Sequence, residues 1–224
     1  MRASLNSRKN VRIKWFDLKD VSYSIERKLE VSYSTGSVEN NINNYSPSFQ
    51  YNFKEVTNTQ IPQSDIIIFE NNLPATYART GGSKGNKFST ELQNDPIVLV
   101  TDRIVELSKG KENITREPPE YPNPRIKEIE IRERDDTVKR KISFKNDSNE
   151  IVNNFELKLV ETKDVRFIDG NPDATKKDPP EYIWTFSIDP EATYSIELKF
   201  QTYIRKTYEI EKEPPRRPDR ALSQ

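Results

Sequence analysis

Apolar and polar residues alternate along long stretches of this chain. The clearest stretches run from Val21 to Tyr33 and from Tyr194 to Ile204, where most alternate positions are apolar or aromatic. Successive side chains of a strand point to opposite faces, so this pattern predicts strands with one apolar and one polar face. Such half-buried strands are typical of antiparallel sheets that have one face in water.

The same alternation recurs in shorter segments, and no segment shows the period of an amphipathic helix. These segments are Val11–Trp15, Phe49–Phe53, Ile142–Phe144, Phe155–Leu159 and Tyr182–Ile188. Many strands without intervening helices indicate sandwiches or barrels. We therefore predict an all-β fold made of two antiparallel β-sandwich-like domains.

A proline cluster marks the predicted boundary between these domains. Four of the seven residues 118–124 are proline. Proline lacks the backbone N–H that a central strand needs, and a proline-rich segment favours a stiff, extended linker. We predict an N-terminal β domain over residues 1–117, a linker over 118–124, a C-terminal β-sandwich over 125–212 and a flexible tail over 213–224.

The composition excludes several kinds of chemistry. The chain has no cysteine and no histidine, which excludes thiolate catalysis, Ser-His-Asp triads and histidine-ligated metals. We therefore predict a non-enzymatic protein without a cofactor. Lys and Arg balance Asp and Glu at 36 each, which argues against nucleic acid as a partner. The basic cluster Lys139–Lys141 is expected to be a solvated strand face.

Hydropathy gives a limited expectation for location. No segment approaches the roughly 18–20 apolar residues of a membrane span, and no signal-peptide pattern opens the chain. The chain has 15 prolines, six glycines and a dense, mixed charge, which suits a robust, thermophilic exterior protein. We expect a cell-surface or extracellular location in preference to the cytoplasm.

The order of strands and turns in the second half is distinctive. It comprises Ile142–Ser148, Phe155–Glu161, a loop at Arg166–Asp169, the Trp-bearing strand Tyr182–Pro190 and a closing strand from Tyr194. Together with the proline turn and strand of Ile61–Glu70, this order resembles the C-terminal β domain of the mucoidy-inhibitor-A-like proteins, a family of unknown function. The resemblance covers roughly residues 49–210. It implies a β-sandwich with an envelope or adhesive role, and it brings no catalytic residues.

One loop has the spacing of oxygen ligands for calcium. Asp169, Asn171 and Asp173 are separated by single residues, as in the first half of a calcium-binding loop. The glycine that such a loop needs at its sixth position is Ala174 here, and its twelfth position is Pro180. An ordinary turn is the favoured interpretation, with these three residues as a weak calcium candidate.

Two segments read Pro-Pro-x-Tyr, which is a ligand type for domains that bind polyproline II helices. In the first, Pro118, Pro119 and Tyr121 belong to the predicted linker and are a weak candidate for partner binding. In the second, Tyr182 alternates with Trp184 and Phe186. We therefore expect Tyr182 and Trp184 to lie in a core.

These observations favour a structural or surface-interaction protein that assembles with itself or with a neighbouring protein. One alternative is an adaptor that binds a peptide or another ligand through the Pro-Pro-x-Tyr segment at Pro118. Another alternative is a hydrolase that relies on carboxylates alone, since a pair of Asp or Glu residues suffices for glycoside hydrolysis.

Overall fold

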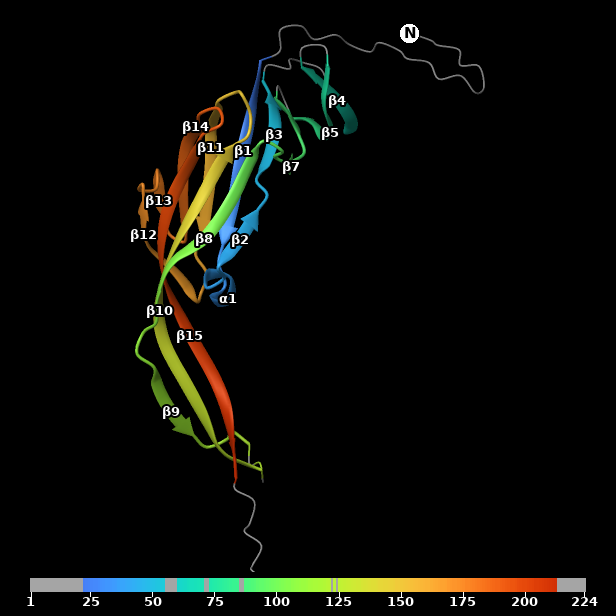
Figure 1. The fold of residues 1–224 in the computed structure, drawn as a ribbon. Helices are drawn as coiled ribbons and strands as arrows, with labels where there is room; N and C mark the ends of the chain where they lie inside the picture. The colour runs from blue at the N-terminus through green and yellow to red at the C-terminus, as the bar shows by residue number, and fades with distance from the viewer. Residues whose placement is uncertain are drawn as a thin grey trace, which may run out of the picture. The chain divides into compact units, whose positions relative to one another are not determined.

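The computed structural model describes residues 22–54, 60–70, 73–84, 87–121, 123 and 125–212 (Figure 1). Of these residues, 71% lie in strands and 2% in helix, which confirms the all-β prediction. In this part of the chain, no helix is long and apolar enough to span a membrane. The predicted strand at Val11–Trp15 and the predicted tail at 213–224 lie outside the described residues.

The chain folds into two compact units that are not continuous in sequence. Unit 1 takes residues up to Glu26 together with Ser48–Asn94, and unit 2 takes Arg27–Pro47 together with all residues from Asp95 onward. The first strand, β1 (Tyr23–Ser32), therefore contributes residues to both units.

Unit 1 is built on one sheet with the strand order β1-β3-β6-β5-β4, and β7 pairs with β3. Its further strands are β3 (Ser48–Phe53), β4 (Ser64–Glu70), β5 (Leu73–Lys84), β6 (Lys87–Thr90) and β7 (Gln93–Asn94). Tyr51, Ala78 and Phe88 are its buried hydrophobic residues among those described. This core is small, and β4 forms one edge of the sheet.

Unit 2 contains two sheets whose inner faces share one core. The first has the order β13-β14-β11-β1, and the second has the order β12-β15-β10-β8-β2 with β9 beside β10. The strands of the first sheet besides β1 are β11 (Val152–Val160), β13 (Lys176–Asp178) and β14 (Glu181–Ile188). Those of the second are β2 (Ile42–Tyr45), β8 (Val98–Ser108), β9 (Asn113–Glu117), β10 (Ile126–Asn146), β12 (Val165–Asn171) and β15 (Thr193–Glu211).

Most of these strands pair in the antiparallel way that the alternation predicts, with one exception. β1 and β11 run parallel, with Leu29 opposite Leu157 and Val31 opposite Leu159. All four side chains are buried, so both strands contribute an apolar row to the core. A short helix, α1 (Thr35–Val38), follows β1 and begins with a capping box in which Ser34 and Ser37 bind each other's backbone N–H groups.

The division into units differs from the predicted one. β8 and β9 precede the proline cluster, and both pair with β10, which follows it. Glu117 of β9 lies opposite Ile129 of β10, so the segment between them connects two neighbouring antiparallel strands inside unit 2. A proline-rich sequence is excluded from a central strand, but it suits a strand-to-strand connection as well as an interdomain linker. Local composition does not distinguish these two uses.

β10 and β15 pair from Ile126 opposite Glu211 to Lys145 opposite Thr193. Thr202 is the last residue of β15 that pairs with β12. Beyond it the sheet narrows to β9, β10 and β15, a region that we call the arm: residues 113–117, 126–136 and 203–211 (Figure 1). No arm residue belongs to the core cluster of unit 2.

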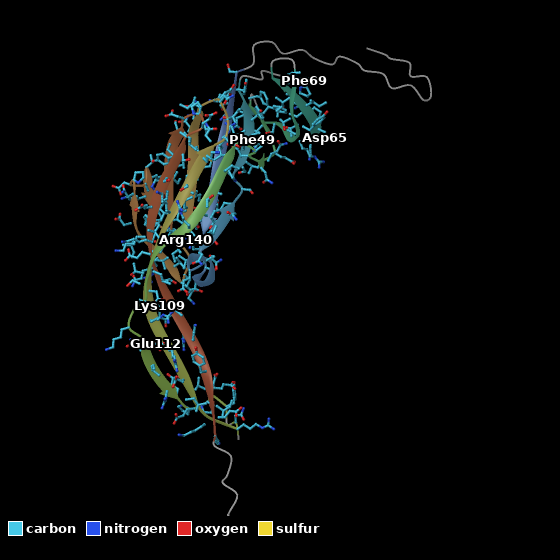
Figure 2. All side chains as sticks on the ribbon, in the orientation of Figure 1. Phe49, Asp65, Phe69, Lys109, Glu112 and Arg140 are labelled. Atoms are coloured by element: carbon cyan, nitrogen blue, oxygen red, sulfur yellow. The ribbon has the colours of Figure 1, made fainter. Side chains whose placement is uncertain are left out.

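A chain of ion pairs follows the face of the arm that continues the inner face of the sandwich. Its members in order are Arg116, Glu130, Arg132, Glu112, Arg134 and Asp136, joined by N–O distances of 3.0, 2.7, 3.6, 4.0 and 2.9 Å. Glu112 stands in the connection between β8 and β9 (Figure 2). We call this chain the ion ladder, and it occupies positions that apolar residues take further along β10.

Gly110 allows the connection between β8 and β9 to approach β10 closely. A Cβ atom at this position would lie 2.0 Å from the carbonyl oxygen of Asp135. The backbone N–H of Gly110 donates a hydrogen bond of 2.8 Å to Asp136 Oδ1. Any other residue here would force the connection away from the strand and remove a partner from the end of the ion ladder.

Candidate interaction surfaces

The predicted calcium ligands lie at and just after the end of β12. Asp169 Oδ1 accepts a hydrogen bond of 2.9 Å from the backbone N–H of Gly170, and Asp173 Oδ1 accepts one of 2.8 Å from Lys177 Nζ. Asn171 is exposed. Among the described residues, no group of three or more acidic side chains is arranged to hold a metal ion. A cation at this loop would have to compete with Lys177 for Asp173.

The two Pro-Pro-x-Tyr segments have different surroundings. Pro118 and Tyr121 are exposed between β9 and β10, with 77% of Tyr121 accessible to solvent. Tyr182, in the second segment, is buried on β14, and its hydroxyl donates a hydrogen bond of 3.2 Å to Glu161 Oε1. The expectation that Tyr182 belongs to the core is confirmed, and the first segment keeps an accessible tyrosine.

Trp184 lies in the core of unit 2, as the alternation predicts. Only 1% of its surface is exposed, and its ring packs edge-on against Phe167 at a centroid distance of 5.7 Å. Its indole N–H donates a hydrogen bond of 2.8 Å to the carbonyl oxygen of Pro172. The polar atom of the indole is therefore satisfied, and the ring is not available as a platform for a ligand.

The expectation for the basic cluster Lys139–Lys141 is wrong at its central residue, because Arg140 is completely buried. Its Nε lies 2.8 Å from Oδ1 and 3.1 Å from Oδ2 of Asp102, which is buried as well. Its Nη1 donates to the carbonyl oxygens of Val38 at 2.6 Å and Asn40 at 2.7 Å. Figure 2 shows Arg140 on β10. Arg140 therefore connects the segment around α1 to the second sheet through hydrogen bonds.

Tyr33 completes this buried network. Its hydroxyl donates a hydrogen bond of 3.0 Å to Asp102 Oδ2, and the Arg140 guanidinium lies 5.5 Å from the centre of its ring. Burial, followed by the charge of Asp102, raises the pKa of Tyr33 well above its usual value. The hydroxyl thus stays protonated and remains a donor. With Asp102 paired to both Arg140 and Tyr33, the network is a structural anchor for α1.

The first candidate surface is the edge of β4 in unit 1. Among the described residues, β5 is the only strand neighbour of β4. Ile67 and Phe69 point to the exposed face, with 49% and 60% of their surfaces in solvent, and Tyr77 lies opposite Ile67 on β5 with 72% exposed. Figure 2 labels Asp65 and Phe69 near the two ends of this strand. We call this surface the apolar edge.

A groove of about 590 Å³ runs along β4, and all four residues from Ile66 to Phe69 belong to its lining. Ile66 and Ile68 are half-buried, and the lining also includes Phe53 and Phe88, whose ring centroids lie 5.3 Å apart. Every residue that lines the groove is uncharged. Exposed apolar surface that is continuous on both faces of an edge strand marks an interaction site or an aggregation hazard.

The second candidate surface is a polar cleft of about 710 Å³ in unit 2. The cleft lies around β15 next to Thr202, where the pairing of β15 with β12 ends. The residues that line it are Thr35, Asp135, Lys163, Asp164, Arg166, Gln201, Tyr203, Ile204, Arg205 and Lys206. Four of these side chains are cationic and two are anionic, so the cleft carries a net positive charge. We call it the cationic cleft.

The sequence interpretation missed both surfaces. The run Ile66–Phe69 is visible as one of the longest apolar runs, and its lack of charge is the signal that could have pointed to an unprotected edge. The cationic cleft has no comparable local signal, because its residues come from α1, β10, β15 and the segment from Lys163 to Arg166. Comparison with known proteins adds no constraint, since no family model, curated protein or solved structure matches this chain.

Proposed function

We propose that this chain is a non-enzymatic structural β module that assembles with copies of itself through the apolar edge of β4. The observation that supports this proposal is the open strand edge of unit 1, with apolar side chains on both of its faces. A strand edge presents unpaired backbone groups, and pairing with another strand satisfies them. The resemblance to an envelope-associated β domain favours the same kind of role.

The contrast with another sheet edge in this protein supports a specific use of β4. The edge strand β13 reads Lys176-Lys177-Asp178, and all three side chains are exposed. Charges on an edge prevent pairing with other chains. The run from Ile66 to Phe69 carries no charge at all. In the part of the chain that the structure describes, one edge is therefore protected by charge and the other has an uncharged apolar run without a second strand neighbour.

A second copy is the partner that the sequence of β4 fits best. An antiparallel pair of β4 strands centred on Ile67 places Ile66 of one copy opposite Ile68 of the other and brings no like charges together. Directly opposed apolar and β-branched side chains stabilise a strand pair. Such pairing is isologous, meaning that both copies use the same patch, and this is the commonest symmetry of homo-oligomers.

The test is the assembly state as a function of concentration, measured by light scattering and sedimentation on the full chain. The wild-type chain should form dimers or larger species, and Ile67→Lys should shift it to monomer. Leu99→Lys is the matched control, because Leu99 is equally exposed but stands on β8, which has a strand on each side. A wild-type chain that stays strictly monomeric at high concentration would overturn the proposal, as would equal assembly of Ile67→Lys and wild type.

A second candidate function is an adaptor that binds polyproline-recognising domains through Pro118, Pro119 and Tyr121. The exposure of Tyr121 is the observation that favours it. Tyr121→Ala should abolish capture by an isolated WW domain and leave assembly unchanged. Equal capture of variant and wild type would dismiss this function.

A further inference from the structure

Among the described residues, β15 has an open edge along the arm. β12 pairs with it from Glu197 to Thr202, and beyond that point β10 is its only strand neighbour among the described residues. The last contact on the open side is a hydrogen bond of 2.9 Å from the N–H of Tyr203 to the carbonyl oxygen of Asp164. From Ile204 onward, the space that a continued β12 would fill holds no described strand.

The hydrogen bond of Tyr203 shows which backbone groups of β15 point to its open side. Along an antiparallel strand, backbone groups point alternately to one neighbour and to the other. Because the N–H of Tyr203 points away from β10, the backbone groups of Arg205, Thr207 and Glu209 point to the open side as well. They form a row of donors and acceptors with the two-residue spacing that an added strand requires.

The cationic cleft lies at the start of this row. Lys163, Arg166 and Lys206 form no ion pair or side-chain hydrogen bond in the part of the chain that the structure describes, and Arg205 lies 3.6 Å from Glu133. The carboxylates of the cleft are Asp135 and Asp164. Three unpaired cations beside an open strand edge favour an extended ligand that carries negative charge. Charge complementarity of this kind sets the choice of partner and its orientation.

We infer that the edge of β15 from Arg205 to Glu211 binds an extended peptide of a partner protein, with acidic residues at the end that enters the cationic cleft. The peptide backbone pairs with Arg205, Thr207 and Glu209. Its carboxylates lie near Lys163, Arg166 and Lys206. The rest of the peptide is uncharged, because Glu209 and Glu211 would repel further acidic residues. This surface is in unit 2, so the inference goes beyond self-assembly through β4 and does not depend on it.

The backbone edge distinguishes a peptide from other anions. A phosphate-containing ligand or a nucleic acid would use the cations of the cleft and gain nothing from the row of N–H and C=O groups. An acidic peptide uses both. The two halves of the site therefore predict that neither charge nor strand-forming ability is sufficient for binding.

The experiment measures binding of two fluorescent eight-residue peptides to the full chain by anisotropy. One has the sequence Asp-Glu-Asp-Glu-Thr-Val-Thr-Val, and the other has the same residues in reverse order. One of the two should bind, and its affinity should fall as salt is raised. A version of the binding peptide that is N-methylated at alternate residues keeps its charges but cannot pair on one side, and it should lose binding.

Charge reversal tests the protein side. Arg166→Glu and Lys206→Glu should each weaken binding about tenfold or more, the size expected for losing a charge-assisted contact. Lys109→Glu is the matched control, since Lys109 is an exposed cation outside the cleft (Figure 2) and should leave the affinity unchanged. All three side chains are exposed, so an unchanged unfolding midpoint should accompany each substitution.

Three results would overturn the inference. The first is that neither peptide binds. The second is that the N-methylated peptide or inorganic polyphosphate binds as tightly as the peptide, which would mean a general anion site without strand pairing. The third is that Lys206→Glu binds the peptide as well as wild type does. None of these results bears on assembly through β4, which Ile67→Lys tests separately.

Discussion

β10 and β15 form one continuous pair, yet its two halves are stabilised in different ways. Within the sandwich, the inward row of β10 includes Val138, Ile142 and Phe144, all fully buried in the core of unit 2. In the arm, the same row continues as Glu130, Arg132 and Arg134, which belong to the ion ladder. The strand pairing continues through both halves, but the kind of side chain on the inward face changes.

This difference shows what a second sheet contributes to the stability of the β10–β15 pair. Where the first sheet covers β10 and β15, apolar burial stabilises the pair at roughly 25 cal/mol for each Å² removed from water. In the arm, the described residues supply no second sheet over the inward face, and an apolar row on that face would stay in contact with water. Ion pairs linked end to end hold the strands in register there, although each exposed pair contributes little alone. The sandwich should therefore be far more sensitive to substitution than the arm.

The largest effect is expected in the sandwich, from Trp184→Ala. Removing this buried ring and its hydrogen bond to Pro172 should lower the free energy of unfolding by about 3–5 kcal/mol, a large part of the roughly 5–15 kcal/mol typical of a domain. Denaturant unfolding measures the loss. Thr185→Ala, at the exposed neighbouring position, is the control and should cost far less. An unchanged midpoint for Trp184→Ala would contradict the burial of this ring.

Arg140→Leu should produce a loss of similar size by another mechanism. It leaves the Asp102 carboxylate buried without its cation, and breaking a buried ion pair in this way costs about 3–5 kcal/mol. The double variant Arg140→Leu with Asp102→Leu also removes the unpaired buried charge, so it should recover part of the lost free energy of unfolding. If the double variant is less stable than the single one in the same denaturant series, the charge of Asp102 is not the cause.

A smaller effect is expected at the base of the arm, from Arg134→Ala. Arg134 Nε lies 3.0 Å from Oδ1 and 2.9 Å from Oδ2 of Asp136, whose side chain is fully buried. The substitution leaves Asp136 with the N–H of Gly110 and should cost about 1–3 kcal/mol. Amide hydrogen exchange should accelerate in the arm and not in the sandwich core.

Lys127→Ala is the control for this experiment. Lys127 forms an exposed pair with Glu128 at 3.9 Å, and such pairs contribute about 0–1 kcal/mol. Its removal should leave amide exchange in the arm almost unchanged. Equal acceleration in both variants would mean that the arm depends on total charge and not on the ion ladder.

The smallest effect is a pH dependence confined to the arm. Hydrogen bonds from Arg132 and then from Arg116 hold the pKa of Glu130 below its ordinary value. A carboxylate whose pKa is lower in the folded than in the unfolded state stabilises the folded state. This stabilisation is complete at pH values above the unfolded pKa, which is about 4.3. This contribution is lost as the pH falls through the folded pKa. Over that range below about pH 4.3, the protection factors of the arm amides, which correct each exchange rate for the intrinsic rate at the same pH, should fall.

Glu130→Gln is the variant that tests this assignment. It removes the titrating group and keeps the length of the side chain, so the fall of the arm protection factors in acid should become smaller. If the variant shows the same dependence on pH as the wild-type chain, another group is responsible.

The sequence by itself determined the local state of the chain. Alternation predicted strands where β10, β14 and β15 are found, and the four-residue face from Tyr182 to Ile188 was sufficient to place Trp184 in a core. These predictions succeeded because the direction of a side chain along a strand depends only on its position in that strand.

The tertiary structure alone decided what covers each face. Arg140 shares the inward row of Val138 and Ile142, so alternation gives its direction, but its partner Asp102 and the carbonyl groups of Val38 and Asn40 come from distant segments. The same holds for the proline cluster, whose role depends on the pairing of β9 with β10, and for the cationic cleft. Alternation specifies two faces of a strand, whereas register and strand order determine which other residues meet them.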